Sequence, residues 1–156
     1  MGKIVVVMGS KKDIDHAKSV EKIAKKFRVP CELRIASAHK TPNKVLKIIE
    51  EYQNEEVVYI TIAGKSNALS GLVDANTTKP VIASPPYSSK FGLGDIFSSL
   101  RMPRGVSPMV ILDPEQSALA AIKILGLYDK ELQVKISNYQ NEFKKKIEQD
   151  DQALNG

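Results

Sequence analysis

Cysteine is nearly absent from this sequence, and its scarcity excludes two kinds of structure. Cys31 is the only cysteine among 156 residues, so we expect no disulfide framework and no cysteine-based metal site. A small buried thiol is its expected role. The chain has only two histidines and no His-x-x-Glu-His spacing, so a histidine metal site is not expected either.

Long hydrophobic runs are also missing. No stretch approaches the roughly 20 apolar residues of a membrane span. The apolar run Ile4–Met8 is short and is soon followed by Lys11-Lys12-Asp13, which is not the pattern of a signal peptide. With 42% apolar and 26% charged residues, the composition is typical of a soluble globular protein. We therefore expect a single domain over residues 1–156, located in the cytoplasm, with no membrane partner.

Tryptophan is missing too, and the positive charge is spread out. The formal net charge of +5 suggests anionic partners. Nucleic acid is not expected, because the basic residues are scattered rather than clustered with aromatic residues. The densest basic run, Lys144–Lys146, is followed by Glu148, Asp150 and Asp151 and is better explained as a solvated helix face. A phosphorylated small molecule needs only a few of these charges.

What the sequence does contain is a regular alternation of apolar runs and helical periodicity. Strands are predicted at Lys3–Met8, Cys31–Ala36, Val57–Ala63, Pro80–Ala83 and Ser107–Leu112. Helices are predicted at Asp13–Phe27, Pro42–Tyr52, Ser66–Asn76 and Pro114–Leu127, the last capped by Asp113. This order predicts an α/β fold of three layers, a parallel sheet with helices on both faces, either flavodoxin-like or Rossmann-like.

Two segments depart from the alternation. Residues 84–105 form a long stretch rich in Pro, Ser and Gly, and loops of that length are usually functional or disordered. After it, residues 129–150 predict an extra C-terminal helix with an apolar stripe that includes Leu132 and Ile147. The pattern alone leaves open whether this helix packs on its own domain or on a neighbouring subunit.

The loop Ser37-Ala38-His39-Lys40-Thr41-Pro42 is the strongest candidate for a functional site. It follows a predicted strand, where α/β proteins build their sites, and it holds one of the two histidines. Histidine ordinarily has a pKa of about 6.5, close to working pH. Thr41 as N-cap and Pro42 at the first helical position form a good helix start on their own. That explanation leaves His39 unexplained.

Polar loops follow two other predicted strands. Gly9 and Ser10 precede the first helix, with Asp13 placed for a capping-box-like pair, and the spacing fits neither the dinucleotide fingerprint nor a Walker loop. Gly64 and Ser66 follow the third strand, where Ser66 could be a simple helix cap. Three such loops at one sheet edge favour a common ligand pocket. The second histidine, His16, lies among polar neighbours on the first helix and is interpreted as a surface residue.

The motifs in order identify a resemblance. They are Gly9-Ser10-x-x-Asp13, Ser37-Ala38-His39-Lys40-Thr41-Pro42, Ala63-Gly64 and Arg101-Met102-Pro103-x-Gly105. From about Lys3 to Leu127 the chain resembles the aminoimidazole ribonucleotide (AIR) carboxylases and the related N-carboxyaminoimidazole ribonucleotide mutases of purine biosynthesis.

The loop after the third strand separates the two branches of this family. The mutase branch carries Ala-Ala-His-Leu-Pro-Gly there, whereas this chain has Ser66-Asn67-Ala68-Leu69-Ser70-Gly71. The chain therefore resembles the carbon-dioxide-using, animal-type (class II) branch. Two further motifs, Pro85-Pro86 and Ser98-Ser99-Leu100-Arg101, are also similar to that branch. Lys65 stands where arginine is commoner, so the charge is kept but the fork geometry is lost.

The resemblance implies an enzyme that converts AIR and carbon dioxide to 4-carboxy-AIR without ATP, a metal or another cofactor. It implies an octamer whose C-terminal helix reaches a neighbouring subunit, and it assigns His39 as the proton carrier. The implied substrate-binding residues are Gly9, Ser10, Asp13, Ser37, Ala38, Lys40, Gly64, Lys65, Ser66 and Asn67. A mutase is the near alternative, and a non-catalytic flavodoxin-like binding or signalling module is the distant one.

Overall fold

The computed structural model contains one sheet of five parallel strands in the order β2-β1-β3-β4-β5. The structure describes residues 2–86 and 94–155. The strands are β1 (Lys3–Met8), β2 (Cys31–Ile35), β3 (Val57–Ile62), β4 (Val81–Ala83) and β5 (Met109–Val110). This strand order is the flavodoxin-like one rather than the Rossmann one. The predicted α/β class is confirmed, and of the two predicted topologies the flavodoxin-like one is correct.

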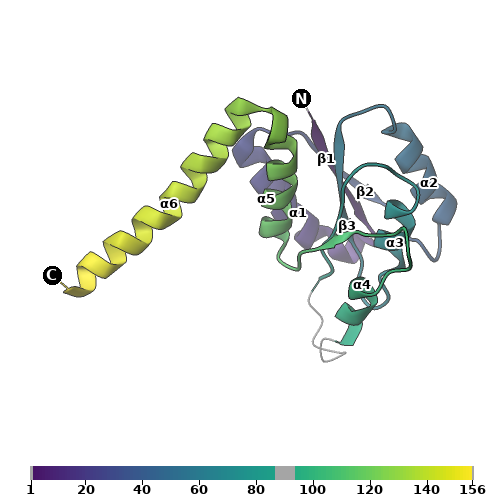
Figure 1. The fold of residues 1–156 in the computed structure, drawn as a ribbon. Coiled ribbons are helices and arrows are strands. Elements are labelled where there is room, and N and C mark those ends of the chain that lie inside the picture. The colour runs from purple at the N-terminus through teal and green to yellow at the C-terminus, as the bar shows by residue number, and fades with distance from the viewer. Residues whose placement is uncertain (1, 87–93, 156) are drawn as a thin grey trace.

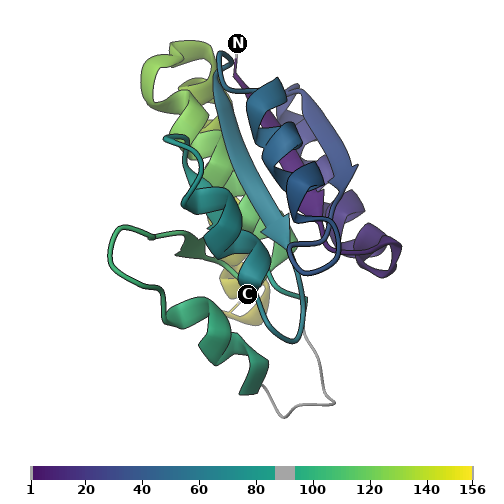
Figure 2. The ribbon, with the colours of Figure 1, turned by 90° about the vertical axis from the view of Figure 1, so that its right-hand side faces the viewer.

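Helices cover both faces of the sheet (Figures 1 and 2). The helices α1 (Ile14–Phe27) and α5 (Pro114–Leu125) pack on one face, and α2 (Pro42–Glu51) and α3 (Ala68–Asp74) pack on the other. Successive strand residues point to opposite faces, so every side chain of β3 is buried. Strands covered on both faces need such unbroken apolar runs, which explains why β1 and β3 were recognisable in the sequence.

The element boundaries agree with the prediction to within one or two residues in most places. The largest differences among these elements are at α3 and β5, each of which is two residues shorter at both ends than predicted. The 3₁₀ turn η1 (Lys11–Asp13) precedes α1. The predicted long loop contains the turn η3 (Gly94–Ile96) and the short helix α4 (Phe97–Leu100), which the sequence did not predict. Its residues 87–93 lie outside the described part of the chain.

The C-terminal helix α6 (Lys130–Asn155) follows the 3₁₀ turn η4 (Gly126–Tyr128) and extends beyond the predicted residues 129–150. Its first half packs on the body of the molecule, where Tyr139 contacts Phe27 edge to face with ring centroids 5.2 Å apart. Its second half projects away from the body (Figure 1) and leaves Phe143 55% and Ile147 68% exposed. Although α6 has 26 residues, neither it nor any other helix in the described residues is long and apolar enough to cross a membrane.

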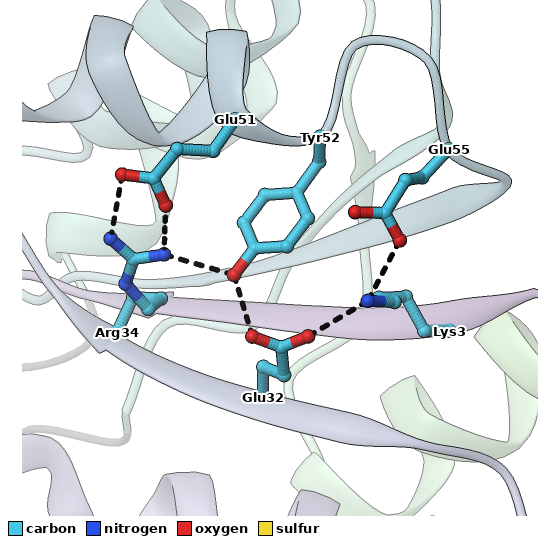
Figure 3. A network of polar contacts seen from close by, with 6 residues as sticks. All are labelled: Lys3, Glu32, Arg34, Glu51, Tyr52 and Glu55. Carbon is cyan, nitrogen blue, oxygen red and sulfur yellow. Dashed lines mark hydrogen bonds and ion pairs between the residues drawn. The ribbon is translucent and has the colours of Figure 1, made fainter.

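A polar network fastens the end of α2 to the strands β1 and β2 (Figure 3). Tyr52 is central to it: its hydroxyl donates to Glu32 at 2.6 Å and accepts from Arg34 at 2.9 Å. The hydrogen bonds from Tyr52 and from the Lys3 ammonium hold the pKa of Glu32 below its usual range. The full network consists of Lys3, Glu32, Arg34, Glu51, Tyr52 and Glu55.

Candidate active site

Three loops meet around a cavity of about 420 Å³ at the carboxyl ends of β1, β2 and β3. Such an edge is where open α/β sheets bind ligands. All the predicted site residues except Asn67 line this cavity, and Lys12, Ala63 and Leu69 line it without having been predicted. The complete lining is Gly9, Ser10, Lys12, Asp13, Ser37, Ala38, His39, Lys40, Ala63, Gly64, Lys65, Ser66 and Leu69.

The first loop, after β1, contains a helix cap, and one residue of that cap is the carboxylate Asp13, which lines the cavity. The Asp13 Oδ2 atom accepts from the Ser10 backbone N–H at 3.2 Å and from the Ser10 hydroxyl at 3.1 Å. Ser10 and Asp13 therefore form the capping-box pair expected from the sequence and also line the cavity. Because the Ser10 proton goes to Asp13, an anion in the cavity needs donors from elsewhere. The Asp13 carboxylate itself suits the hydroxyl groups of a ligand.

The second loop is a turn over residues 38–40 that is closed by its own neighbours. The Thr41 Oγ1 atom accepts from the Ser37 backbone N–H at 2.9 Å and donates to the Ser37 carbonyl at 3.3 Å. The Lys40 backbone N–H donates to the Ser37 hydroxyl oxygen at 3.3 Å. Thr41 precedes Pro42 at the start of α2, but its side chain closes the loop rather than capping the helix. His39 is therefore an exposed side chain on a backbone that does not depend on it.

The third loop has a strained backbone and a buried amide. Lys65 has a φ of 63°, in the left-handed region that favours glycine, and its backbone N–H donates to Asp95 at 3.4 Å. Asn67 is only 4% exposed, and its amide nitrogen donates to the Ser99 hydroxyl at 2.9 Å. Its amide oxygen caps α3 by accepting from the Ser70 backbone N–H at 3.2 Å. The side chain of Asn67 thus ties α3 to α4 instead of facing the cavity.

The interpretation of His16 as a surface residue is wrong. Its side chain is half-buried, and its Nε2 atom lies 3.0 Å from the Ser84 hydroxyl at the end of β4. Burial lowers the pKa of His16, and the nearby Asp13 carboxylate partly opposes this effect. One signal was available in the sequence: His16 lies one helical turn before Val20, which is buried against the sheet.

The charges around the cavity select for a ligand of mixed character. Among the described residues that line the cavity, Lys12, Lys40 and Lys65 are the cationic ones and Asp13 is the one carboxylate, an arrangement that suits an anionic ligand with hydroxyl groups. Residues 2–86 and 94–155 contain no group of three or more potential metal ligands from His, Cys, Asp and Glu. A larger groove of about 560 Å³ beside α2 holds Glu50 and Lys79 but neither histidine.

Comparisons with known proteins agree with this geometry. A family model described as AIR carboxylase matches residues 3–146. A phosphoribosylaminoimidazole carboxylase of Archaeoglobus fulgidus is 54% identical over 152 residues, which cover 97% of this chain and 84% of that protein. A bifunctional phosphoribosylaminoimidazole carboxylase/succinocarboxamide synthetase of Rattus norvegicus is 42% identical over 127 residues, 80% of this chain and 30% of that protein. The crystal structure of Treponema denticola PurE superimposes with a TM-score of 0.96 at 42% identity, covering 99% of both chains.

Proposed function

The chain belongs to the AIR carboxylase family, and from this premise we propose that it converts AIR and carbon dioxide to 4-carboxy-AIR in purine biosynthesis. The observation that carries the proposal is the position of His39. It is held on a self-closed turn at the edge of a cavity with three lysines and one carboxylate. The proposed reaction uses neither ATP nor a metal.

The chemistry requires one group that takes and returns a proton. The amino group of AIR directs electron density to ring carbon 4, which attacks carbon dioxide and becomes tetrahedral. Loss of the ring proton at that carbon restores the aromatic ring, and the imidazole of His39 receives this proton. In the reverse direction His39 returns the proton to carbon 4 before carbon dioxide leaves. An imidazole suits this exchange near neutral pH.

The remaining cavity residues divide between the two ends of the substrate. Lys12, Lys40 and the Ser37 hydroxyl supply donors for the phosphate, because the Ser37 oxygen accepts from Lys40 N and its own proton stays available. Asp13 accepts hydrogen bonds from the ribose hydroxyls. Loop amides after Gly64, with the Ser66 side chain, stabilise negative charge as the carboxylate forms. Asn67 is left out of this scheme because both ends of its amide bond other protein groups.

The choice between carboxylase and mutase rests on Ala68, which stands where the mutase branch carries a second histidine. The test supplies AIR with carbon dioxide, AIR with bicarbonate before the two equilibrate, and the N-carboxylated compound with carbon dioxide scavenged. We expect the fastest turnover with AIR and carbon dioxide. Faster turnover of the N-carboxylated compound would identify a mutase. A folded protein that turns over none of them would be a binding module.

We also propose that the chain works as a homo-oligomer, most simply an octamer, in the cytoplasm, with no nucleic acid or membrane partner. The exposed apolar residues Phe143 and Ile147 on the projecting half of α6 support an interface there. The positive charge of the chain is explained by a phosphorylated small-molecule substrate, so no larger anionic partner is required.

A further inference from the structure

The contact between His16 and Ser84 is the strongest feature that the reaction scheme leaves unused. Ser84 is fully buried at the end of β4, and its hydroxyl donates to the Leu112 carbonyl at 3.3 Å. With the Ser84 proton on the Leu112 carbonyl, the Ser84 oxygen accepts the N–H of His16 Nε2, 3.0 Å away, in the tautomer that carries its proton on Nε2. The result is a directional chain of hydrogen bonds from α1, across the end of β4, to the residue before the cap of α5.

His16 and Ser84 do not line the cavity themselves, but each lies next to residues at its edge. On one side, His16 lies one helical turn after Asp13, which lines the cavity. On the other side, Ser84 precedes Pro85 and Pro86 where the backbone leaves β4. A Cβ atom placed on Gly64, another lining residue, would lie 3.6 Å from Pro86 Cγ, in ordinary van der Waals contact. Pro86 thus lies about one carbon atom's width from the backbone of Gly64, and the Ser84 backbone N–H donates at 2.8 Å to the Thr61 carbonyl of β3, the strand that leads into Gly64. Moving the end of β4 would therefore disturb the backbone that leads to Gly64.

We propose that His16 is a positioning residue for the carboxylation site, which through Ser84 fixes the end of β4 and the adjoining loop that carries Gly64 relative to the wall that carries Asp13. The inference rests on the proposed function. Gly64 belongs to the loop assigned to the reacting end of the substrate, so an error in its position acts on the chemical step. Small misplacements of this kind can cost up to about 10²-fold in rate.

The state of the ring agrees with this role. Burial lowers the pKa of His16, while Asp13 at the start of its own helix and Asp113 at the start of α5 act in the opposite direction. Near neutral pH the ring is then uncharged and has one N–H to donate, and the Ser84 oxygen is its acceptor.

The test compares His16→Gln with His16→Asn. The amide nitrogen of glutamine can occupy the place of Nε2, whereas that of asparagine corresponds to Nδ1 and falls short of Ser84. Both variants are assayed well below their melting temperatures, with kcat expressed per folded enzyme. We expect His16→Gln to keep most of the wild-type kcat and His16→Asn to lose about tenfold or more, with the KM for AIR little changed.

Ser84→Ala provides an independent variant that removes the acceptor. We expect it to reproduce the loss of kcat, and we expect His16→Asn to add little in the Ser84→Ala background, because residues that act through one contact are not additive. Lys22→Gln is the matched control: it removes another contact of α1, the 3.3 Å ion pair with Glu115 on α5, away from the cavity. It should leave kcat unchanged.

Two results would overturn the inference. One is a wild-type kcat in folded His16→Asn and Ser84→Ala proteins. The other is a fall in the kcat of His16→Asn that His16→Gln shows to the same extent. A contact that only stabilised the fold would give one of these two results. An inactive wild-type enzyme would instead contradict the proposed function, so the two failures can be told apart.

Discussion

At the scale of single residues, His39 is separated from the interactions that hold its loop. The turn is closed by Ser37, Lys40 and Thr41, so His39→Asn should keep both the fold and the affinity for AIR. Turnover should fall by the roughly 10²- to 10⁴-fold typical of a general acid–base group, or by more for a sole proton carrier. Steady-state kinetics, calorimetric AIR binding and thermal unfolding measure the three properties. A folded His39→Asn protein with wild-type turnover would remove His39 from the mechanism.

We expect His16 to make the stability of the fold depend on pH. Its pKa in the folded protein lies below the ordinary value of 6.5, because burial disfavours the charged ring. As pH falls below about 6.5, the unfolded chain binds the proton before the folded protein does, so the free energy of unfolding decreases. Urea unfolding at a series of pH values should show this decrease in the wild type. The His16→Gln protein should lack that component, and identical pH profiles of the two proteins would contradict the assignment.

The same two histidines show how far single residues could be interpreted from the sequence. His39 was predictable because the end of a strand places it, and strand ends follow from apolar runs. His16 was misjudged because its partner Ser84 is 68 positions away and belongs to a different element. Asn67 has a structural role that its position also predicts: an asparagine three residues before Ser70 is typical of a helix cap, and the structure shows that cap.

At the scale of elements, the network around Tyr52 holds the end of α2 on the edge strand β2. Tyr52→Phe removes the hydroxyl that bridges Arg34 and Glu32 but keeps the buried ring, so we expect a loss of about 1 kcal/mol in the free energy of unfolding. Equilibrium urea unfolding measures it. Tyr128→Phe is the control, because Tyr128 is 94% exposed and should change nothing. Equal stability of both variants would show that the bridge contributes nothing.

Elements were predictable where burial dictates the pattern and less so where a few contacts decide. The strands β1 and β3 are buried on both faces, and the helices α1 and α2 bury one stripe, so their sequences carry clear periods. In contrast, α4 spans four residues, too few for a helical period. The residue that bonds to α4 is Asn67, whose backbone and side-chain N–H groups donate to the hydroxyls of Ser98 and Ser99. Asn67 lies about 30 positions earlier in the chain, so no local pattern reveals these contacts.

At the scale of the whole molecule, the layers follow from the sequence but the strand order does not. An alternation of strands and helices fits both doubly wound topologies, because each unit of strand, helix and strand looks the same locally. The order β2-β1-β3-β4-β5 depends on which strands pair, such as β1 with both β2 and β3. That order brings the loops after β1, β2 and β3 together at one edge. The sequence could predict that a polar loop follows each of these strands, but not that the three strands are neighbours.

We expect helix α6 to determine how copies of the chain assemble. Its first half is part of the fold: Tyr139 packs on Phe27, and Glu142 pairs with Lys26 at 3.2 Å. A chain that ends after Glu142 should therefore stay folded but form smaller species than the full chain. Removal of all of α6 would also strip the core of Leu132 and Ile136. Multi-angle light scattering at micromolar concentration measures the masses, and circular dichroism checks the fold.

A sharper version of this experiment keeps the length of the helix and changes only its surface. Replacing Phe143 and Ile147 by serine removes the exposed apolar side chains of the projecting half, at positions four residues apart on one face. Lys145→Ser changes the opposite face and serves as the control. We expect the double variant to shift to smaller assemblies and the control to keep the wild-type mass. The reason is that burial between copies would remove the exposed apolar side chains from water. A wild-type chain that is monomeric at micromolar concentration, or a double variant with unchanged mass, would show that this half of α6 is not an interface.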